Sequence, residues 1–310
     1  MSDRPTLEQL DEVRDHFGLP TSSLVEKDWY VVKALAAIAA ADTGDLRLVF
    51  GGGTALGRAH GLIRRMSEDI DFKIVAEKAP PRPALRDLRG KITSALLEAG
   101  FEFDPANEEH VKVMHESSFT RYQLPYRALA EGRGVLRPQI QIETSVWPMR
   151  RPAMDLPVRS FIAEAYEQQP EVSGIECTSI VESAAEKLIA LTRRAGAELA
   201  GLRRPRDSTL VRHIYDLHEI KDHHDAADVA ALAREVMIHD AATRGRDFPA
   251  YQKDPLAETI NAIDRIAADE HFSNNYAAFT RDMVYGAAPD FATAMGTLKG
   301  LAGHLAKLRA

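Results

Sequence analysis

A glycine-rich turn followed closely by two aspartates constrains the fold of this chain more than any other feature of its sequence. Residues 46–50, LRLVF, predict a short buried strand that runs directly into Gly51-Gly52-Gly53. The segment TALGRAHG predicts a brief helix, and residues 69–75, DIDFKIV, predict a second strand. The order strand, glycine turn, helix, strand therefore brings the turn and the aspartates onto adjacent strands.

The two aspartates lie on one face of the second strand. Residues i and i+2 of a strand face the same side, so Asp69 and Asp71 project together while Ile70 and Phe72 enter the apolar face. Neighbouring carboxylates repel unless a cation lies between them, and Mg²⁺ is held by carboxylates together with substrate phosphates. The pair predicts a site for Mg²⁺, with Mn²⁺ as the alternative, of the kind that supports phosphoryl transfer.

The glycine turn suits the phosphates of a nucleoside triphosphate. Glycine permits positive φ angles and close backbone approach, and the start of the following helix offers N–H groups to an anion. Gly52 and Gly53 are therefore predicted to bind the triphosphate, and Thr54 adds a hydroxyl. Ser67, just before the aspartates, is a candidate phosphate neighbour or phosphorylation site, because an added phosphate there would repel an incoming triphosphate.

Two other glycine motifs compete with this interpretation. A P-loop requires Gly-Lys-Ser/Thr, but Gly57 is followed by Arg58 and Ala59, which excludes it. The dinucleotide fingerprint G-x-G-x-x-G fails only at its last position, Leu56, so a Rossmann-type oxidoreductase remains an alternative. That alternative leaves the second aspartate unexplained and predicts a parallel α/β continuation, where the later strands look antiparallel and are followed by helices.

Glu143 is a candidate third metal ligand. In PQIQIETSV, Gln139, Gln141 and Glu143 alternate with apolar residues and so share the polar face of a predicted strand. A glutamate at such a position is as readily an ordinary edge residue. Its assignment as a metal ligand rests on a superfamily pattern and not on a sharp local motif.

The chain is long enough for two domains. Its 310 residues, 45% hydrophobic and 27% charged, are typical of a globular protein. Strands are expected up to about residue 146 and only helices from about residue 175. We expect an α/β domain with N-terminal helices over 1–165 and a helical domain over 166–310. The other expected helices and strands are 6–17, 24–41, 85–99, 101–104, 109–116, 118–124, 137–146, 226–238, 254–268 and 288–307.

Composition indicates a cytoplasmic protein. Cys177 is the sole cysteine, which rules out an intrachain disulfide, and the polar, acidic N-terminus and the lack of a long apolar run argue against secretion and membrane insertion. A formal net charge of −7 argues against coating of nucleic acid by the whole surface. Local arginine clusters could still form a path for RNA: Arg64-Arg65, Arg193-Arg194, Arg203-Arg204, Arg206 and Arg212.

With these motifs, the chain resembles the AbiEii/AbiGii family of nucleotidyltransferase toxins, which includes the MenT toxins and belongs to the DNA polymerase β-like superfamily. Four motifs carry the resemblance, which spans nearly the whole chain: GGTAL at 52–56, SEDID at 67–71, EKLIAL at 186–191 and RHIYDL at 212–217. The resemblance implies a polymerase β-like α+β core with a short mixed sheet, followed by a helical C-terminal domain.

The resemblance also implies an activity. Such a toxin transfers a nucleoside monophosphate from an NTP, typically to the 3′ end of tRNA, and so inhibits growth; its partners are NTP, RNA and a cognate antitoxin. Carried over by position, the site residues are the metal ligands Asp69 and Asp71, the triphosphate-binding Gly52, Gly53 and Thr54, the phosphate-binding Lys187 and the supporting Asp216. Many relatives have aspartate where this chain has His213. A catalytically silent nucleotide-binding module is the alternative.

Helix patterns alone give Lys187 and Asp216 ordinary roles. Ser179 and Glu182 predict a capped helix whose buried stripe includes Leu188 and excludes Lys187, so an exposed lysine is expected. Asp216 lies one turn from Arg212, which predicts an ion pair within one helix.

Overall fold

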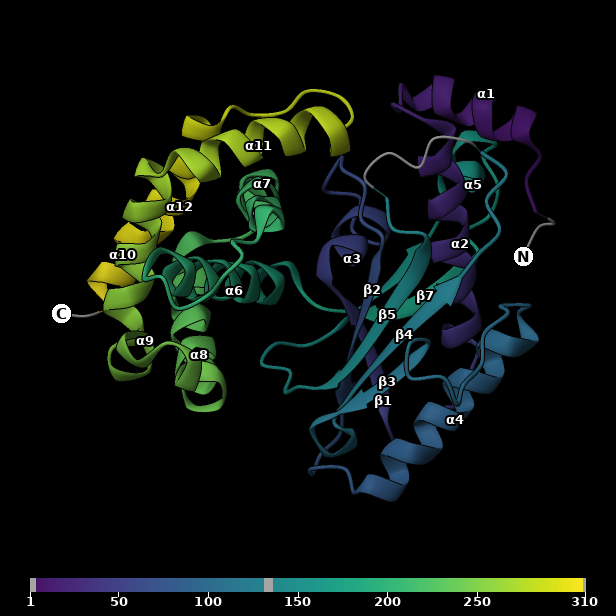
Figure 1. Ribbon diagram of the computed structural model, residues 1–310, viewed down its shortest axis with the longest axis horizontal. Helices are drawn as coiled ribbons and strands as arrows, with labels where there is room; N and C mark the ends of the chain where they lie inside the picture. The colour runs from purple at the N-terminus through teal and green to yellow at the C-terminus, as the bar shows by residue number, and fades with distance from the viewer. Residues whose placement is uncertain (1–3, 131–135, 309–310) are drawn as a thin grey trace. The chain divides into compact units, whose positions relative to one another are not determined.

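The chain divides into two compact units. The computed structural model describes residues 4–130 and 136–308, and the units comprise residues 1–178 and 179–310. Figure 1 shows that the first contains the sheet and that the second is made of helices. The boundary expected after residue 165 falls before the last strand of the sheet, whereas the first unit continues through that strand to Thr178.

The first unit is built on a seven-stranded mixed sheet in the order β3-β4-β5-β2-β1-β7-β6. Its strands are β1 Arg47–Gly51, β2 Asp69–Val75, β3 Val111–Met114, β4 Phe119–Pro125, β5 Gln139–Val146, β6 Met154–Val158 and β7 Val172–Cys177. β2 pairs with β5 and β1 with β7 in parallel, and the other neighbours are antiparallel. The expected α/β class with a mixed sheet is confirmed, and the sheet is larger than expected.

The two faces of the sheet differ in chemistry. Ile70, Ile142 and Tyr122 are aligned across β2, β5 and β4 and are fully buried. The Tyr122 hydroxyl donates to the Arg89 carbonyl, so this apolar face packs against the helix α4, Arg82–Glu98. Asp71 and Glu143, the partners in register on the other face, are only partly buried. The alternation expected from DIDF and QIQIE therefore aims the carboxylates away from the apolar core.

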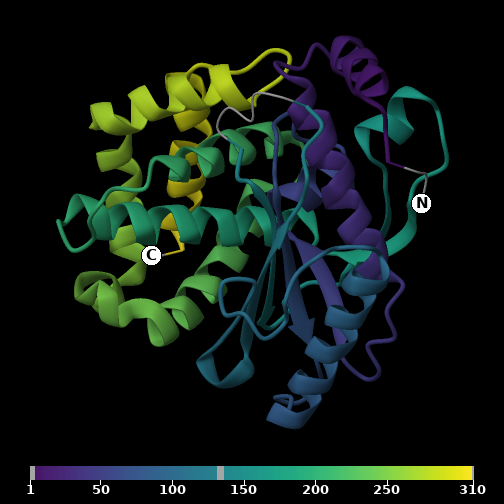
Figure 2. The same ribbon diagram turned by 45° about the vertical axis from the view of Figure 1, so that its right-hand side comes forward.

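Within the first unit, α2 and α4 lie side by side next to the sheet (Figure 2). α3 follows β1 directly and packs on β1 and β2. The helices of the first unit are α1 Leu7–Phe17, α2 Ser22–Ala39, α3 Gly52–Arg58, α4 Arg82–Glu98 and α5 Phe161–Ala165, with a 3₁₀ turn at His115–Ser117.

Helix α2 carries three consecutive buried charges, Glu26, Lys27 and Asp28. Glu26 accepts hydrogen bonds from the backbone N–H groups of Leu129 and Ala130 at 2.8 and 3.0 Å. The Asp28 carboxylate contacts Arg58 Nε at 2.7 Å and accepts the N–H of Phe161 at 2.7 Å. Buried charges are tolerated only when paired in this way, so α2 is tied to several distant segments.

The described residues of the second unit, 179–308, form helices and no strand. They are α6 Ile180–Leu199, α7 Val211–Glu219, α8 Ala226–Arg244, α9 Pro249–Lys253, α10 Pro255–Ala268, α11 Glu270–Met283 and α12 Phe291–Lys307, with 3₁₀ turns at Ser208–Leu210, Lys221–His223 and Gly245–Asp247. α6 packs on α7, α8 and α10, and Ser179 Oγ caps it by accepting the Glu182 N–H at 3.2 Å, as predicted. Among the described residues, none of the helices combines the length and apolar character needed to span a membrane.

Several sequence expectations differ from the structure. The segment 101–104 is not a strand, and β6, β7, α5, α9 and α11 were not expected. β6 contains Pro157, and its exposed residues lack a clear alternation, so the pattern that identifies a half-buried strand is weak there.

We predict that Asp28 makes stability depend on pH. Burial raises the pKa of Asp28 from its ordinary value of 3.8 to about 6, against the lowering effect of Arg58. The folded state therefore binds this proton more tightly than the unfolded state, and the associated stabilisation is complete below about pH 4 and lost as pH rises through about 6. The unfolding free energy of the wild type minus that of Asp28→Asn should be measured from pH 4 to 7. This difference should decrease with rising pH, by an amount on the order of 3 kcal/mol. A difference that stays constant with pH would contradict this.

Candidate functional site

The glycine turn lies directly against β2. Gly51, the last residue of β1, is the register partner of Asp71. Gly52 has a φ of 74°, and a Cβ there would overlap the Asp71 carboxylate and lie 3.0 Å from its Cγ. A Cβ on Gly53 would lie 2.8 Å from Ser67 Oγ and overlap the Arg65 guanidinium. Both positions therefore require glycine for close approach, and Gly52 also for its backbone conformation.

Thr54 and Ser67 join the turn to the start of β2. The buried Thr54 hydroxyl donates to the Asp69 carbonyl and lies 3.0 Å from Ser67 Oγ. The first turn of α3 is thus fastened to the strand that carries the aspartates. The structure brings together Gly52, Gly53, Thr54, Ser67, Asp69 and Asp71, and their roles toward a nucleotide remain predictions.

Glu143 lies next to Asp71 in the sheet but has its own partners. Its Oε1 accepts from Arg121 Nε and from Gln141 Nε2, each at 3.0 Å. Within the described part of the chain, no group of three or more histidine, cysteine, aspartate or glutamate side chains is arranged to hold a metal ion. The assignment of Glu143 as a third metal ligand therefore stays a prediction.

The aspartates themselves suit a hard divalent cation. Asp69 and Asp71 present carboxylate oxygens on one face of β2, and the Asp69 carboxylate is already paired with a cation, the Arg137 guanidinium. Oxygen donors from one or two carboxylates, completed by phosphates, are what Mg²⁺ takes in nucleotide sites. The donor set fits the predicted ion.

Arg137 is a site residue that sequence reasoning missed. Its N–H donates to Glu68 Oε2 at 2.9 Å, and its carbonyl accepts from Lys27 Nζ at 3.0 Å. Lys27 also pairs with Glu68 at 3.2 Å. These residues are distant in sequence, and a lone arginine before Pro138 carries no motif that could have identified it.

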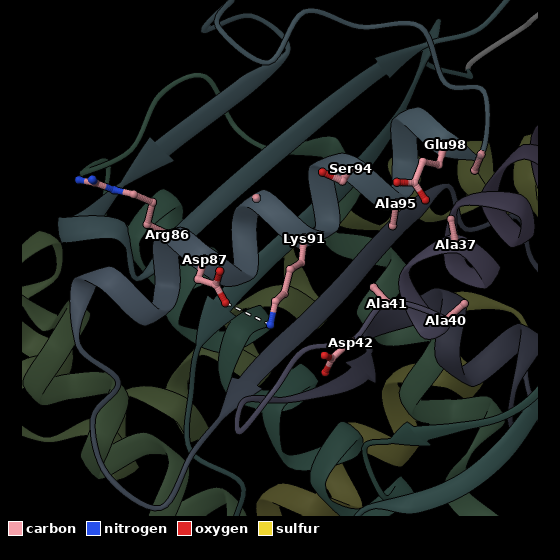
Figure 3. A pocket seen from close by; sticks show the side chains of 12 residues that line it. Ala37, Ala40, Ala41, Asp42, Arg86, Asp87, Lys91, Ser94, Ala95 and Glu98 are labelled. Atoms are coloured by element: carbon pink, nitrogen blue, oxygen red, sulfur yellow. Dashed lines mark ion pairs between the residues drawn. The ribbon is translucent and has the colours of Figure 1, made fainter.

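A groove of about 740 Å³ lies between the end of α2 and α4 (Figure 3). Small residues such as Ala37, Ala41 and Gly90 leave it open, and Lys91 and Asp87 form an ion pair at 3.1 Å beside it. Because α4 covers the apolar face of the sheet, this groove is separate from the carboxylates of Asp69 and Asp71.

In the second unit, Lys187 and Asp216 form a buried ion pair. Lys187 Nζ donates to Asp216 Oδ2 at 2.7 Å, and their side chains are 9% and 0% exposed. The expectation of an exposed lysine is corrected, and Asp216 has a partner on a different helix, α6. Because α6 is packed against several neighbouring helices, a position outside its apolar stripe is still covered.

His213 does not take the place of Asp216 as the partner of the ammonium. Burial, and next the nearby charges of Lys187 and Arg212, lower the pKa of His213 well below its ordinary value. Its Nδ1 has no hydrogen-bond partner in the structure. His213 is therefore a neutral imidazole at neutral pH. The charged partner of the Lys187 ammonium is the Asp216 carboxylate.

At least three of the eight arginines of the predicted path are used in internal ion pairs. Arg193 pairs with Asp240 at 2.7 Å, Arg206 with Asp269 at 2.9 Å and Arg194 with Asp207. Arg65 is buried beside Gly53, whereas Arg64, Arg203 and Arg204 are exposed. The exposed arginines are therefore fewer than the clusters suggested.

Comparisons with known proteins agree with these features. A family model described as nucleotidyl transferase AbiEii toxin, type IV toxin–antitoxin system, matches residues 33–297. The solved structure of MenT4, a nucleotidyltransferase toxin from Mycobacterium tuberculosis H37Rv, is similar with a TM-score of 0.63 and 20% identity, covering 96% of this chain and 89% of that chain. A search of curated proteins finds no match.

The family match decides between the alternatives drawn from the sequence. An oxidoreductase and a catalytically silent module are both set aside, because the matched family is one of nucleotidyltransferases and the match spans both units. The antiparallel pairing of β1 with β2 also differs from the parallel βαβ unit of a dinucleotide site. The chain therefore belongs to the AbiEii family of nucleotidyltransferase toxins of type IV toxin–antitoxin systems.

Proposed function

We propose that this toxin transfers a nucleoside monophosphate from an NTP to an RNA, with the 3′ end of tRNA as the expected acceptor, in a reaction that requires Mg²⁺ or Mn²⁺. The observation that carries the proposal is the close approach of Gly52 to the Asp71 carboxylate. It puts a backbone able to receive phosphates next to carboxylates able to hold their counterion.

In the proposed reaction, an RNA 3′ hydroxyl attacks the α-phosphorus of the NTP and pyrophosphate leaves. Asp69 and Asp71 would hold the metal ion, which when bound neutralises phosphate charge and orients the attacking and leaving oxygens. The residues from Gly52 to Thr54 bind the triphosphate, and Ser67 lies beside Gly53 and Thr54 at the same turn. The catalytic contribution is thus position and electrostatics, as expected for phosphoryl transfer.

Lys187 is proposed to bind a phosphate of the NTP. Asp216 holds its ammonium at 2.7 Å and so limits the rotamers of a long, flexible side chain. Asp216 is accordingly a positioning residue in this proposal. The exposed Arg203 and Arg204 are candidates for RNA contacts. In this proposal, modification of RNA in the cytoplasm inhibits growth, and a cognate antitoxin relieves the inhibition.

We predict that Asp69→Asn or Asp71→Asn lowers nucleotide transfer at least about 100-fold, because either change removes one of the charges that hold the cation. Transfer is measured by incubating each protein with labelled NTPs and total RNA. Asp155→Asn, an exposed aspartate of β6 in the same sheet, serves as the matched control. Wild-type rates in the folded Asp69 and Asp71 variants would exclude the metal assignment.

We predict that Gly53→Ala weakens NTP binding about tenfold or more, because the added Cβ displaces Arg65 and Ser67 at the phosphate turn. The control is Gly57→Ala in the same helix, where a Cβ meets Ile63 at an ordinary 3.5 Å. Binding is measured by calorimetry with each NTP. Equal affinities for the two variants would mean that Gly53 serves only the fold.

For Lys187, we predict separate effects on stability and activity. Lys187→Met alone leaves the Asp216 carboxylate buried without its ammonium, which costs about 3–5 kcal/mol of stability. The double variant Lys187→Met with Asp216→Asn removes both charges and should recover most of that loss. Its transfer rate should nevertheless stay about 30- to 1,000-fold below wild type. A stable double variant with a wild-type rate would show that the pair is only structural.

A further inference from the structure

The Arg137 guanidinium pairs with Asp69, the residue proposed to hold a metal ion. Its side chain is 34% exposed, whereas that of Asp69 is 16% exposed. A guanidinium and a divalent cation are both attracted by the same carboxylate, and they repel each other. Arg137 would therefore compete with an entering metal ion for the Asp69 carboxylate.

The backbone of Arg137 is held by bonds of its own N–H and carbonyl, and its guanidinium Nε also lies 3.9 Å from Glu68 Oε1. Glu68 accepts the Arg137 N–H and Lys27 donates to the Arg137 carbonyl, and Lys27 donates again to the Gln139 carbonyl at 2.6 Å. Lys27 is completely buried, and Glu68 nearly so. The main chain at residue 137 is thus anchored from two sides, while the guanidinium ends in a partly exposed position.

This arrangement differs from that of an arginine with a purely structural role in the same unit. The Arg58 side chain is 9% exposed, stacks on the Phe161 ring at 3.4 Å and pairs with a buried Asp28. Moving Arg58 would leave the buried Asp28 carboxylate without its counterion. Moving the Arg137 head group gives up its contacts with Asp69 and Glu68 but need not break the bonds of the Arg137 N–H and carbonyl. The Arg137 guanidinium can therefore leave Asp69 for another anion while the Arg137 backbone stays in place.

We propose that Arg137 exchanges the Asp69 carboxylate for the phosphates of the nucleotide when a divalent ion binds Asp69. The inference rests on the proposed function of the same site. Before binding, the guanidinium neutralises a carboxylate that would otherwise lie beside another; afterwards it forms charge-assisted, bidentate bonds to phosphate oxygens. Metal binding thereby makes Arg137 available, and the ion and the nucleotide bind cooperatively.

The test measures two affinities in the full-length protein. Binding of Mn²⁺ alone is followed by the electron paramagnetic resonance of the free ion, and binding of the four α,β-methylene nucleoside triphosphates with Mg²⁺ is followed by calorimetry. In Arg137→Met, Mn²⁺ should bind about tenfold tighter, because its competitor is gone, and the best analogue about tenfold weaker or more. Arg47→Met, which removes an exposed arginine paired with Glu176 at the far end of β1, should change neither affinity.

A second variant separates charge from geometry and covers the case in which Arg137→Met does not fold. Arg137→Lys keeps the charge but loses the bidentate fork, so Mn²⁺ affinity should stay near wild type while the analogue binds less tightly. Unchanged or weaker Mn²⁺ binding by folded Arg137→Met, or nucleotide affinity unaffected in both variants, overturns the inference. If one of these outcomes overturns the inference but wild type binds Mn²⁺ and Asp69→Asn does not, the proposed function still stands. Wild type that binds neither Mn²⁺ nor any analogue would overturn both.

Discussion

The first unit depends on one turn of α2 in which Glu26, Lys27 and Asp28 are all buried. Desolvating a charge costs several kcal/mol, so each must have partners of fixed geometry. Each has partners in a different segment: Glu26 binds the backbone around residue 129, Lys27 binds Glu68 and the start of β5, and Asp28 binds α3 and α5. The helix determines where segments distant in sequence lie, including those flanking the candidate site.

The part of the site that could be predicted from sequence is local. Alternation puts Asp69 and Asp71 on one strand face, and consecutive glycines before a short helix mark a turn that the backbone must approach closely. Arg137 could not be predicted, since its contact with Asp69 depends on the pairing of β5 with β2 and on a lysine 110 residues earlier. Contacts of this kind have no periodicity in the chain.

The same distinction applies to the fold. Most long helices and the alternating strands were predicted, but α11 was missed. β7, with its exposed Ser173 and Gly174, has little alternation and joins the sheet through partners β1 and β6. Burial of Lys187 was missed for a related reason. An apolar stripe identifies the face of α6 that must be covered, but the number of helices around α6 decides how much more is covered.

The parallel pairing of β2 with β5 and of β1 with β7 affects when the site can form. The strands that carry the glycine turn and the aspartates lie in the middle of the sheet, and their outer neighbours follow about 70 and 125 residues later in the chain. During synthesis, the amino-terminal part emerges from the ribosome without β5, Arg137 or β7. An unfinished toxin on the ribosome thus lacks the strands that align its carboxylates, and the cell is exposed to an assembled site only after the first unit has been completed.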